Sequence, residues 1–252
     1  LSIGVSGTQY VNIVANNVQS TKVLDTVISI NGTQSIKQIL NNNNLNNCSE
    51  LYIYGVVTSL KLDTIPYLTE IDASKNKVLE RITGEGDTNL TKINVYGCSK
   101  LKELNLVNTK LSTLSLYGCT ALETLVLNGG ELASLSISGN TALKTLTCSG
   151  NKLSTLDISK NTKIETLNIS NNTISTLDIS LNTALKEFSC YGNLFTTTGY
   201  DSLMCLLPNR NSTDTALFYP LYNAKDTNAT TFLAANASNA TAKNWQVVSG
   251  IG

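Results

Sequence analysis

The chain has 252 residues, and its 18 basic residues are balanced by 18 acidic ones. No basic stripe gathers along it, which argues against a nucleic-acid ligand, because phosphate backbones are bound by clustered lysine and arginine. No apolar run reaches the length of a membrane span, and no signal-peptide pattern opens the chain, so we expect a leader or anchor to lie outside this sequence.

Histidine is absent from the sequence, which removes the commonest general base and a frequent metal ligand. The six cysteines form no CxxC pair, so a zinc site would need thiolates or carboxylates alone. We therefore expect no metal, no cofactor and no enzymatic activity.

Residues 1–55 are predicted to form a β-rich N-terminal cap. β-branched runs at 1–5, 10–14 and 23–30 are separated by glycines and asparagines, a pattern typical of strands joined by turns. An exposed first coil of a repeat structure would leave an unpaired sheet edge and an open apolar core. A covering element is therefore expected at this end.

Residues 56–193 carry an internal repeat. Apolar residues recur nine times in the spacing LxxLxLxxN between Leu101 and Asn193, in alternating steps of 10 and 11 residues, and the last six copies end in asparagine. A looser version precedes them. Two half-repeats make a coil of 21 or 22 residues, a period typical of solenoids. Each half contains a segment of alternating apolar and polar residues, which predicts a strand with one buried face. The predicted fold is a mainly β solenoid with two parallel sheets.

Asparagines close the half-repeats in register. The two sets are Asn140, Asn161 and Asn182, and Asn151, Asn172 and Asn193. A buried amide at a turn can bond main-chain groups that the bend leaves unpaired, and stacked copies can bond one another. We interpret both sets as structural ladders.

The cysteines follow the repeat as well. Cys148 and Cys190 occupy an inward position where other repeats carry leucine, as suits a small buried apolar residue. Cys98 and Cys119 lie one coil apart in the same register, at a Cα separation of about 4.8 Å, which does not exclude a disulfide. We favour two free thiols there, because in-register side chains point side by side rather than at each other.

Residues 194–252 break the period and are predicted to form a C-terminal α/β cap. Leu203, Leu206 and Leu207 share one helical face before Pro208 ends the helix. The pattern then predicts a strand over 216–222, an alanine-rich helix over 229–240 and a terminal strand over 245–248. Such a cap would cover the other open end of the solenoid.

The unit that begins at Leu143, LKTLTCSGNKLSTLDISKNTK, resembles the leucine-rich repeats of cell-surface and secreted proteins of Bacteroides-type bacteria. Its form LxxLxCxxNxLxxLDISxNT is also similar to the cysteine-containing repeats of internalin-like adhesins. The resemblance covers about residues 60–193 and is strongest at the two LDIS segments. It implies a leucine-rich repeat solenoid, extracellular or on the outer cell surface, that binds a partner and carries no enzymatic activity. We expect it to be a monomer.

Four tyrosines are the candidate ligand-binding residues: Tyr52, Tyr54, Tyr96 and Tyr117. Tyr54, Tyr96 and Tyr117 fall at equivalent outward positions of one predicted sheet, with Ser74 between the first two. Exposed tyrosines give a large contact area at low entropic cost, and they pack on protein surfaces or on sugar rings. A tyrosine ladder that only stiffens the sheet is the alternative.

The functional prediction is a binding or adhesion module for a protein or a glycan. A passive spacer that holds another domain away from the cell surface is the second hypothesis. A third is a retaining glycosidase that uses Asp157 and Asp178, which share a column on adjacent coils about 5 Å apart; an outward sheet face offers such a pair no cleft. Gly84 and Gly86 lack the spacing of a phosphate-binding loop and are expected in a turn.

Overall fold

The computed structural model describes the backbone of residues 3–4, 9–17, 20–30, 48–54, 57–62, 67–86, 89–221, 229–233, 235 and 237–249, and most of the side chains in these ranges from residue 49 onward. The chain comprises two compact units, Leu1–Glu131 and Leu132–Gly252, called unit 1 and unit 2 below.

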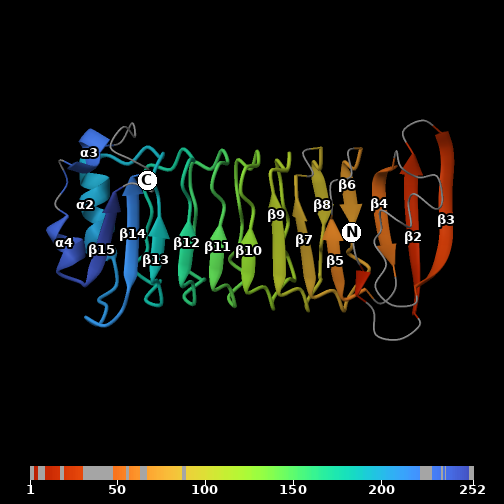
Figure 1. Ribbon diagram of the computed structural model, residues 1–252, viewed down its shortest axis with the longest axis horizontal. Coiled ribbons are helices and arrows are strands. Elements are labelled where there is room, and N and C mark those ends of the chain that lie inside the picture. The colour runs from red at the N-terminus through yellow and green to blue at the C-terminus, as the bar shows by residue number, and fades with distance from the viewer. Residues whose placement is uncertain are drawn as a thin grey trace. The chain divides into compact units, whose positions relative to one another are not determined.

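Unit 1 contains two sheets (Figure 1). The first has the spatial order β3 (Ser20–Ile30), β2 (Gln9–Asn17), β4 (Cys48–Tyr54), β6 (Glu70–Asp72) and β8 (Lys92–Asn94). β2 pairs antiparallel with β3 and β4, whereas β4, β6 and β8 pair in parallel. Antiparallel strands therefore precede the first parallel coil, at the place where the sequence predicts a β-rich cap.

The second sheet of unit 1 contains β1 (Ile3–Gly4), β5 (Ser59–Leu62), β7 (Arg81–Glu85), β9 (Glu103–Val107) and β10 (Thr124–Val126). β1 pairs antiparallel with β5, and the other neighbours pair in parallel. Leu60, Ile82, Leu104 and Leu125 occupy one register column, and each is fully buried. The alternation of apolar and polar residues thus places one side of each strand in the core, and the predicted solenoid with two parallel sheets is confirmed in this unit.

Unit 2 contains one parallel sheet, made of β11 (Thr145–Thr147), β12 (Thr166–Asn168), β13 (Glu187–Ser189), β14 (Ala216–Leu221) and β15 (Trp245–Ser249). The intervening half-repeats, such as residues 153–160, form no strand among the described residues of this unit. Asp157 there accepts the Ser159 N–H with its own side chain, but Asp72 makes the equivalent bond to Ser74 at the end of β6 in unit 1, so this turn bond does not account for the missing strand. The second predicted sheet does not extend through unit 2.

The asparagine ladders are confirmed in unit 2. Asn161 Nδ2 donates to the carbonyls of Ile137 and Asn140, and Asn182 Nδ2 repeats the pattern one coil later at the carbonyls of Ile158 and Asn161. The side-chain amides of the second ladder both donate and accept. Their Oδ1 atoms accept main-chain N–H groups of the preceding coil, and the members are Asn151, Asn172 and Asn193. The turns of the coil are thus held by buried amides.

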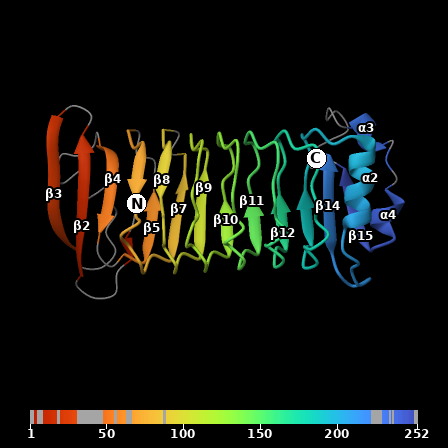
Figure 2. The same cartoon turned by 180° about the vertical axis from the view of Figure 1, so that it is seen from behind.

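The end of the chain continues the parallel sheet of unit 2. α2 (Thr197–Leu206) begins at Thr196, whose hydroxyl accepts from the Gly199 N–H, and stops before Pro208 as predicted. α2, α3 (Ala229–Leu233) and α4 (Ser238–Thr241) pack on one another and on β14 and β15 (Figure 2). The single helix predicted over 229–240 is therefore wrong. The polar sequence around Ser238 favours short helices with local bonds, such as that from the Thr241 hydroxyl to the Ser238 carbonyl.

The boundaries predicted at 55/56 and 193/194 remain predictions. β14 and β15 join the sheet on the far side of the second boundary with no change of strand direction, so the fold marks no break there. Phe218 of β14 stacks on Phe188 of β13 at a centroid distance of 5.4 Å, and both rings are fully buried. The apolar core of the repeats thus passes directly into the C-terminal segment.

Candidate binding surface

The turn that follows β8 places Tyr96 on the surface of unit 1. Asn94 Oδ1 accepts the Tyr96 N–H at 3.1 Å, and Gly97 continues the turn with φ +68°. The next coil repeats the turn with Tyr117 and Gly118, and the Gly97 N–H donates to the Tyr117 carbonyl at 2.9 Å. A Cβ on Gly118 would lie 2.8 Å from the Gly97 Cα. The two turns therefore pack glycine against glycine, which brings the neighbouring tyrosines together.

Tyr96 and Tyr117 form a stacked pair on this surface. Their ring centroids are 5.2 Å apart and the ring planes differ by 15°. Tyr96 is 54% exposed and Tyr117 is 70% exposed, although large aromatic side chains normally bury most of their surface. The pair is ordered by its own contact while remaining open to a partner. We call these two residues the tyrosine pair.

The other two candidate tyrosines differ from this pair. Tyr52 lies in β4, in the register column of Asp72, and its hydroxyl donates to Glu50 at 3.2 Å. Burial and the Glu50 carboxylate raise the pKa of this half-buried phenol. Tyr54 ends β4 in the register expected for it, and its side chain lies outside the described residues. The structure therefore brings together Tyr96 and Tyr117 out of the four.

Three lysines lie in the turn that carries Tyr96 and in the equivalent turn of the preceding coil. Lys77 Nζ donates to the carbonyls of Tyr96 and Gly97, each at 3.3 Å. Lys75 precedes it in the same turn, and Lys100 follows Tyr96 in the next; all three side chains are exposed. These lysines were not among the residues predicted from the sequence, although their spacing relative to Ser74 and Tyr96 is a signal that the sequence carries.

The thiols of Cys98 and Cys119 lie beneath this surface. Both residues are fully buried and their thiols are free, so the preference for two free thiols is confirmed. Cys98 Sγ donates to the Ala73 carbonyl at 3.4 Å, and Cys119 Sγ donates to the Val95 carbonyl at 3.2 Å. Burial raises the pKa of Cys98 to about 11 and also raises that of Cys119. These thiols occupy the register that holds Asn161 and Asn182 in unit 2, and they bond the equivalent carbonyls.

Asp157 and Asp178 hold turns in unit 2. Both are exposed, and their Oδ1 atoms accept the backbone N–H groups of Ser159 and Ser180 at 2.9 and 2.8 Å. Hydrogen bonds from these serines lower the pKa of both carboxyl groups. A retaining glycosidase needs one carboxylic acid whose pKa is raised so that it stays protonated. The shifts here run in the opposite direction, which disfavours the glycosidase hypothesis.

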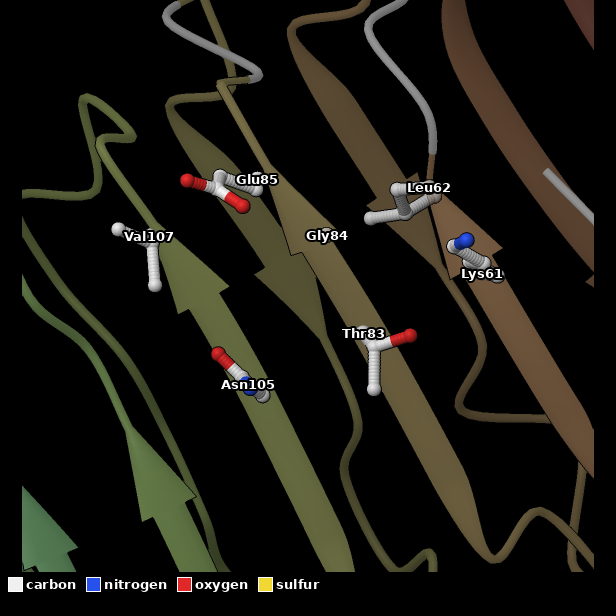
Figure 3. A pocket seen from close by; sticks show the side chains of 7 residues that line it. All are labelled: Lys61, Leu62, Thr83, Gly84, Glu85, Asn105 and Val107. Atoms are coloured by element: carbon white, nitrogen blue, oxygen red, sulfur yellow. The ribbon is translucent and has the colours of Figure 1, made fainter.

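A shallow hollow of about 660 Å³ lies on the sheet of unit 1 formed by β5, β7 and β9 (Figure 3). Its polar lining comes from Lys61, Thr83, Glu85 and Asn105. Gly84 lies inside β7, paired with Leu62 and Leu106, so the expectation that Gly84 is in a turn is wrong. Gly86 follows β7 with φ +77°, and its N–H donates to the Val107 carbonyl at 3.1 Å. The hollow has the size of a ligand site without the apolar walls that usually enclose one. The sequence signal for it is a glycine at the position where the neighbouring coils carry Leu62 and Leu106.

Within the described ranges no group of three or more His, Cys, Asp or Glu residues could hold a metal ion. Among the same residues, no helix combines the length and the apolar character needed to cross a membrane.

No protein-family model matches the sequence, and no match is found among curated proteins. Similar solved structures include the functional domain of InlJ from Listeria monocytogenes, which includes a cysteine ladder, at 21% identity and a TM-score of 0.46. InlF, an internalin of Listeria monocytogenes, gives 14% and 0.46, and a leucine-rich repeat protein of Leptospira interrogans gives 22% and 0.41.

These matches cover 72%, 70% and 54% of this chain and 45%, 62% and 44% of the respective relatives. The chain therefore spans less than two thirds of each. Its fold is that of a leucine-rich repeat solenoid.

Proposed function

We propose that this chain is a non-enzymatic binding module, surface-exposed or secreted, that recognises a protein or a glycan through the tyrosine pair. The exposed stack of Tyr96 on Tyr117 carries the proposal. A pair that only stiffened the turns would gain most from covering its rings, yet more than half of each side chain remains in water.

The stack also favours recognition energetically. Tyrosine is enriched among the residues that contribute most to binding energy at protein interfaces. Binding normally costs about 0.5–1.5 kcal/mol for each side chain that becomes immobilised. Because Tyr96 and Tyr117 already hold each other in place, part of this cost is met before a partner arrives.

Location at the cell surface and an origin in a Bacteroides-type bacterium belong to the same proposal. They rest on the LDIS segments around Asp157 and Asp178, which resemble repeats of exported proteins from such bacteria. The partner would be a protein or glycan of host cells or of other bacteria, and the chain would act as a monomer.

The test is binding of the purified protein to a glycan array and to a panel of extracellular-matrix proteins. The variant Tyr96→Ser/Tyr117→Ser is compared with wild type, and Tyr67→Ser serves as the matched control, because Tyr67 is also 53% exposed but lies in another register column. We expect a ligand that binds wild type and Tyr67→Ser but not the double variant. A second variant, Tyr52→Ser/Tyr54→Ser, tests the remaining candidates and is expected to lose less affinity, since Tyr52 is half-buried and bonded to Glu50.

The passive spacer is the alternative. It is favoured if no ligand on either panel distinguishes wild type from the double variant. Equal binding by both proteins to one identified ligand would show that another surface is responsible.

A further inference from the structure

We infer that the partner of the tyrosine pair is an acidic protein segment rather than a carbohydrate. This inference rests on the proposed function and concerns the same surface. It follows from the charges around the pair and from the parts of the two rings that face solvent.

The turns around the tyrosine pair are positively charged. Residues 73–79, 96–101 and 117–122 contain Lys75, Lys77 and Lys100 and neither aspartate nor glutamate. None of these lysines forms an ion pair among the described residues. Lysines on the neighbouring strands of the same unit do, as Lys92 does with Glu70 and Lys102 with Glu80. The positive charges near the tyrosine pair are therefore available to pair with carboxylates of a partner.

The carboxylate that precedes the first of these turns offsets only part of this charge, and Glu80, which follows the same turn, is paired with Lys102. Asp72 ends β6, just before the first of these turns, and its Oδ1 accepts the Ser74 N–H at 2.8 Å. Its Oδ2 accepts from Asn94 Nδ2 at 3.0 Å. Both oxygens are therefore committed to holding the turns that carry Lys75 and Tyr96. Because these donors are neutral, Asp72 keeps its charge and offsets one of the three ammonium charges, so the turns remain positively charged.

The stack itself presents hydrogen-bond donors and ring edges. Each ring of the pair covers one face of the other, so a sugar ring has fewer open faces on which to pack. The edge of an aromatic ring is its positive part, and the phenol hydroxyls and the lysine ammonium groups donate hydrogen bonds. An ionised carboxylate only accepts. The complementary partner is therefore rich in carboxylates, and aspartate and glutamate side chains supply them in a protein.

Selection from a random peptide library displayed on phage tests the inference directly. Peptides are selected on the intact wild-type protein and counter-selected on Tyr96→Ser/Tyr117→Ser, so that only peptides that need the tyrosine pair remain. We expect these peptides to be enriched in aspartate and glutamate relative to the unselected library. Raising the salt concentration from about 50 to about 300 mM should weaken their binding by about tenfold or more, because exposed charges are screened.

A matched pair of charge variants completes the test. The variant Lys75→Glu/Lys77→Glu/Lys100→Glu should lower the affinity for the selected peptides by about tenfold or more. Lys160→Glu/Lys163→Glu reverses charge in a turn of unit 2 that has no tyrosine, with Lys160 in the register of Lys75. This control should bind within about twofold of wild type.

The outcomes separate the inference from the proposed function. Selected peptides that are neutral or basic, or that ignore the triple variant, overturn the acidic partner while the tyrosine pair remains a binding site. A selection without tyrosine-dependent peptides overturns the inference as well. If a glycan then binds wild type and not the double tyrosine variant, the proposed function still holds with a carbohydrate partner.

Discussion

Replacing Asn172 by alanine should destabilise unit 2 far more than a typical polar substitution. This amide is 6% exposed and bonds two successive coils. Its Oδ1 accepts the Leu153 N–H at 3.0 Å, and its Nδ2 donates to the carbonyls of Cys148 and Ile169 at 3.0 and 2.9 Å. Alanine can provide none of these bonds.

The size of this destabilisation follows from the hydrogen bonds that each partner of Asn172 keeps after the substitution. The Leu153 N–H loses its side-chain acceptor inside the protein, and a buried unsatisfied donor costs about 1–3 kcal/mol. The Cys148 carbonyl keeps the bond from Asn151, and the Ile169 carbonyl keeps that from Asn193. Losing one further bond at each carbonyl costs about 0.5–1.5 kcal/mol. The free energy of unfolding should therefore fall by about 2–6 kcal/mol.

Urea unfolding and amide hydrogen exchange measure this loss. We expect a lower denaturation midpoint and faster exchange of the Leu153 amide. The exchange measurement gives a local readout that holds even if the repeats do not unfold in one step. The control is Ser154→Ala, an exposed neighbour whose replacement should change stability by less than about 0.5 kcal/mol. Equal effects of the two substitutions, with unchanged exchange at Leu153, would refute the role assigned to the amide ladder.

Three further predictions concern the turns and the thiols. Gly118→Ala should lower the free energy of unfolding by at least about 2 kcal/mol, because a side chain at φ +79° is strained and its Cβ would meet the Gly97 backbone. The control is Gly139→Ala, which lies in the same register but has open space around its Cβ and no positive φ, and which should be tolerated. Equal unfolding midpoints of the two variants would contradict this view. In the folded protein a thiol reagent at pH 8 should label the exposed Cys205 quickly, whereas the buried thiols should react only on unfolding; these are Cys98, Cys119, Cys148 and Cys190. Burial raises the pKa of Cys98 to about 11 and that of Cys148 to about 12. If mass-spectrometric mapping finds Cys98 labelled as fast as Cys205, the Cys98 thiol is accessible. Hydrogen bonds from Ser159 and Ser180 lower the pKa values of Asp157 and Asp178. These carboxylates therefore stabilise the folded state above about pH 4, and this contribution is lost as the pH falls through the folded-state pKa. The variant Asp157→Asn/Asp178→Asn keeps the turn acceptor, as Asn94 shows, and should lose less stability between about pH 5 and pH 2 than wild type.

Local pattern was enough to predict the repeating coil. Each strand buries every second residue, so alternating leucines such as Leu104 and Leu106 indicate which side of the strand faces the core. A fixed step of 21 or 22 residues states that successive coils stack in register, and the asparagines mark the bends where main-chain groups need partners. These properties repeat along the chain and depend on neighbours in sequence, which is why periodicity reveals them.

Contacts between coils and the extent of the second sheet were decided by the tertiary structure. Whether Tyr96 meets Tyr117 depends on how closely Gly97 and Gly118 let two turns approach, and the position of Lys77 beside Tyr96 depends on where its flexible side chain finds acceptors. In unit 2 the alternating pattern of residues 153–160 forms no strand among the described residues, although the same pattern forms β6 and β8 in unit 1. The sequence by itself determined the coil and its buried face, and its period placed residues such as Tyr96 and Tyr117 on neighbouring coils. Which exposed side chains stack or bond was decided by the tertiary structure, because the period fixes the register and not the side-chain conformations.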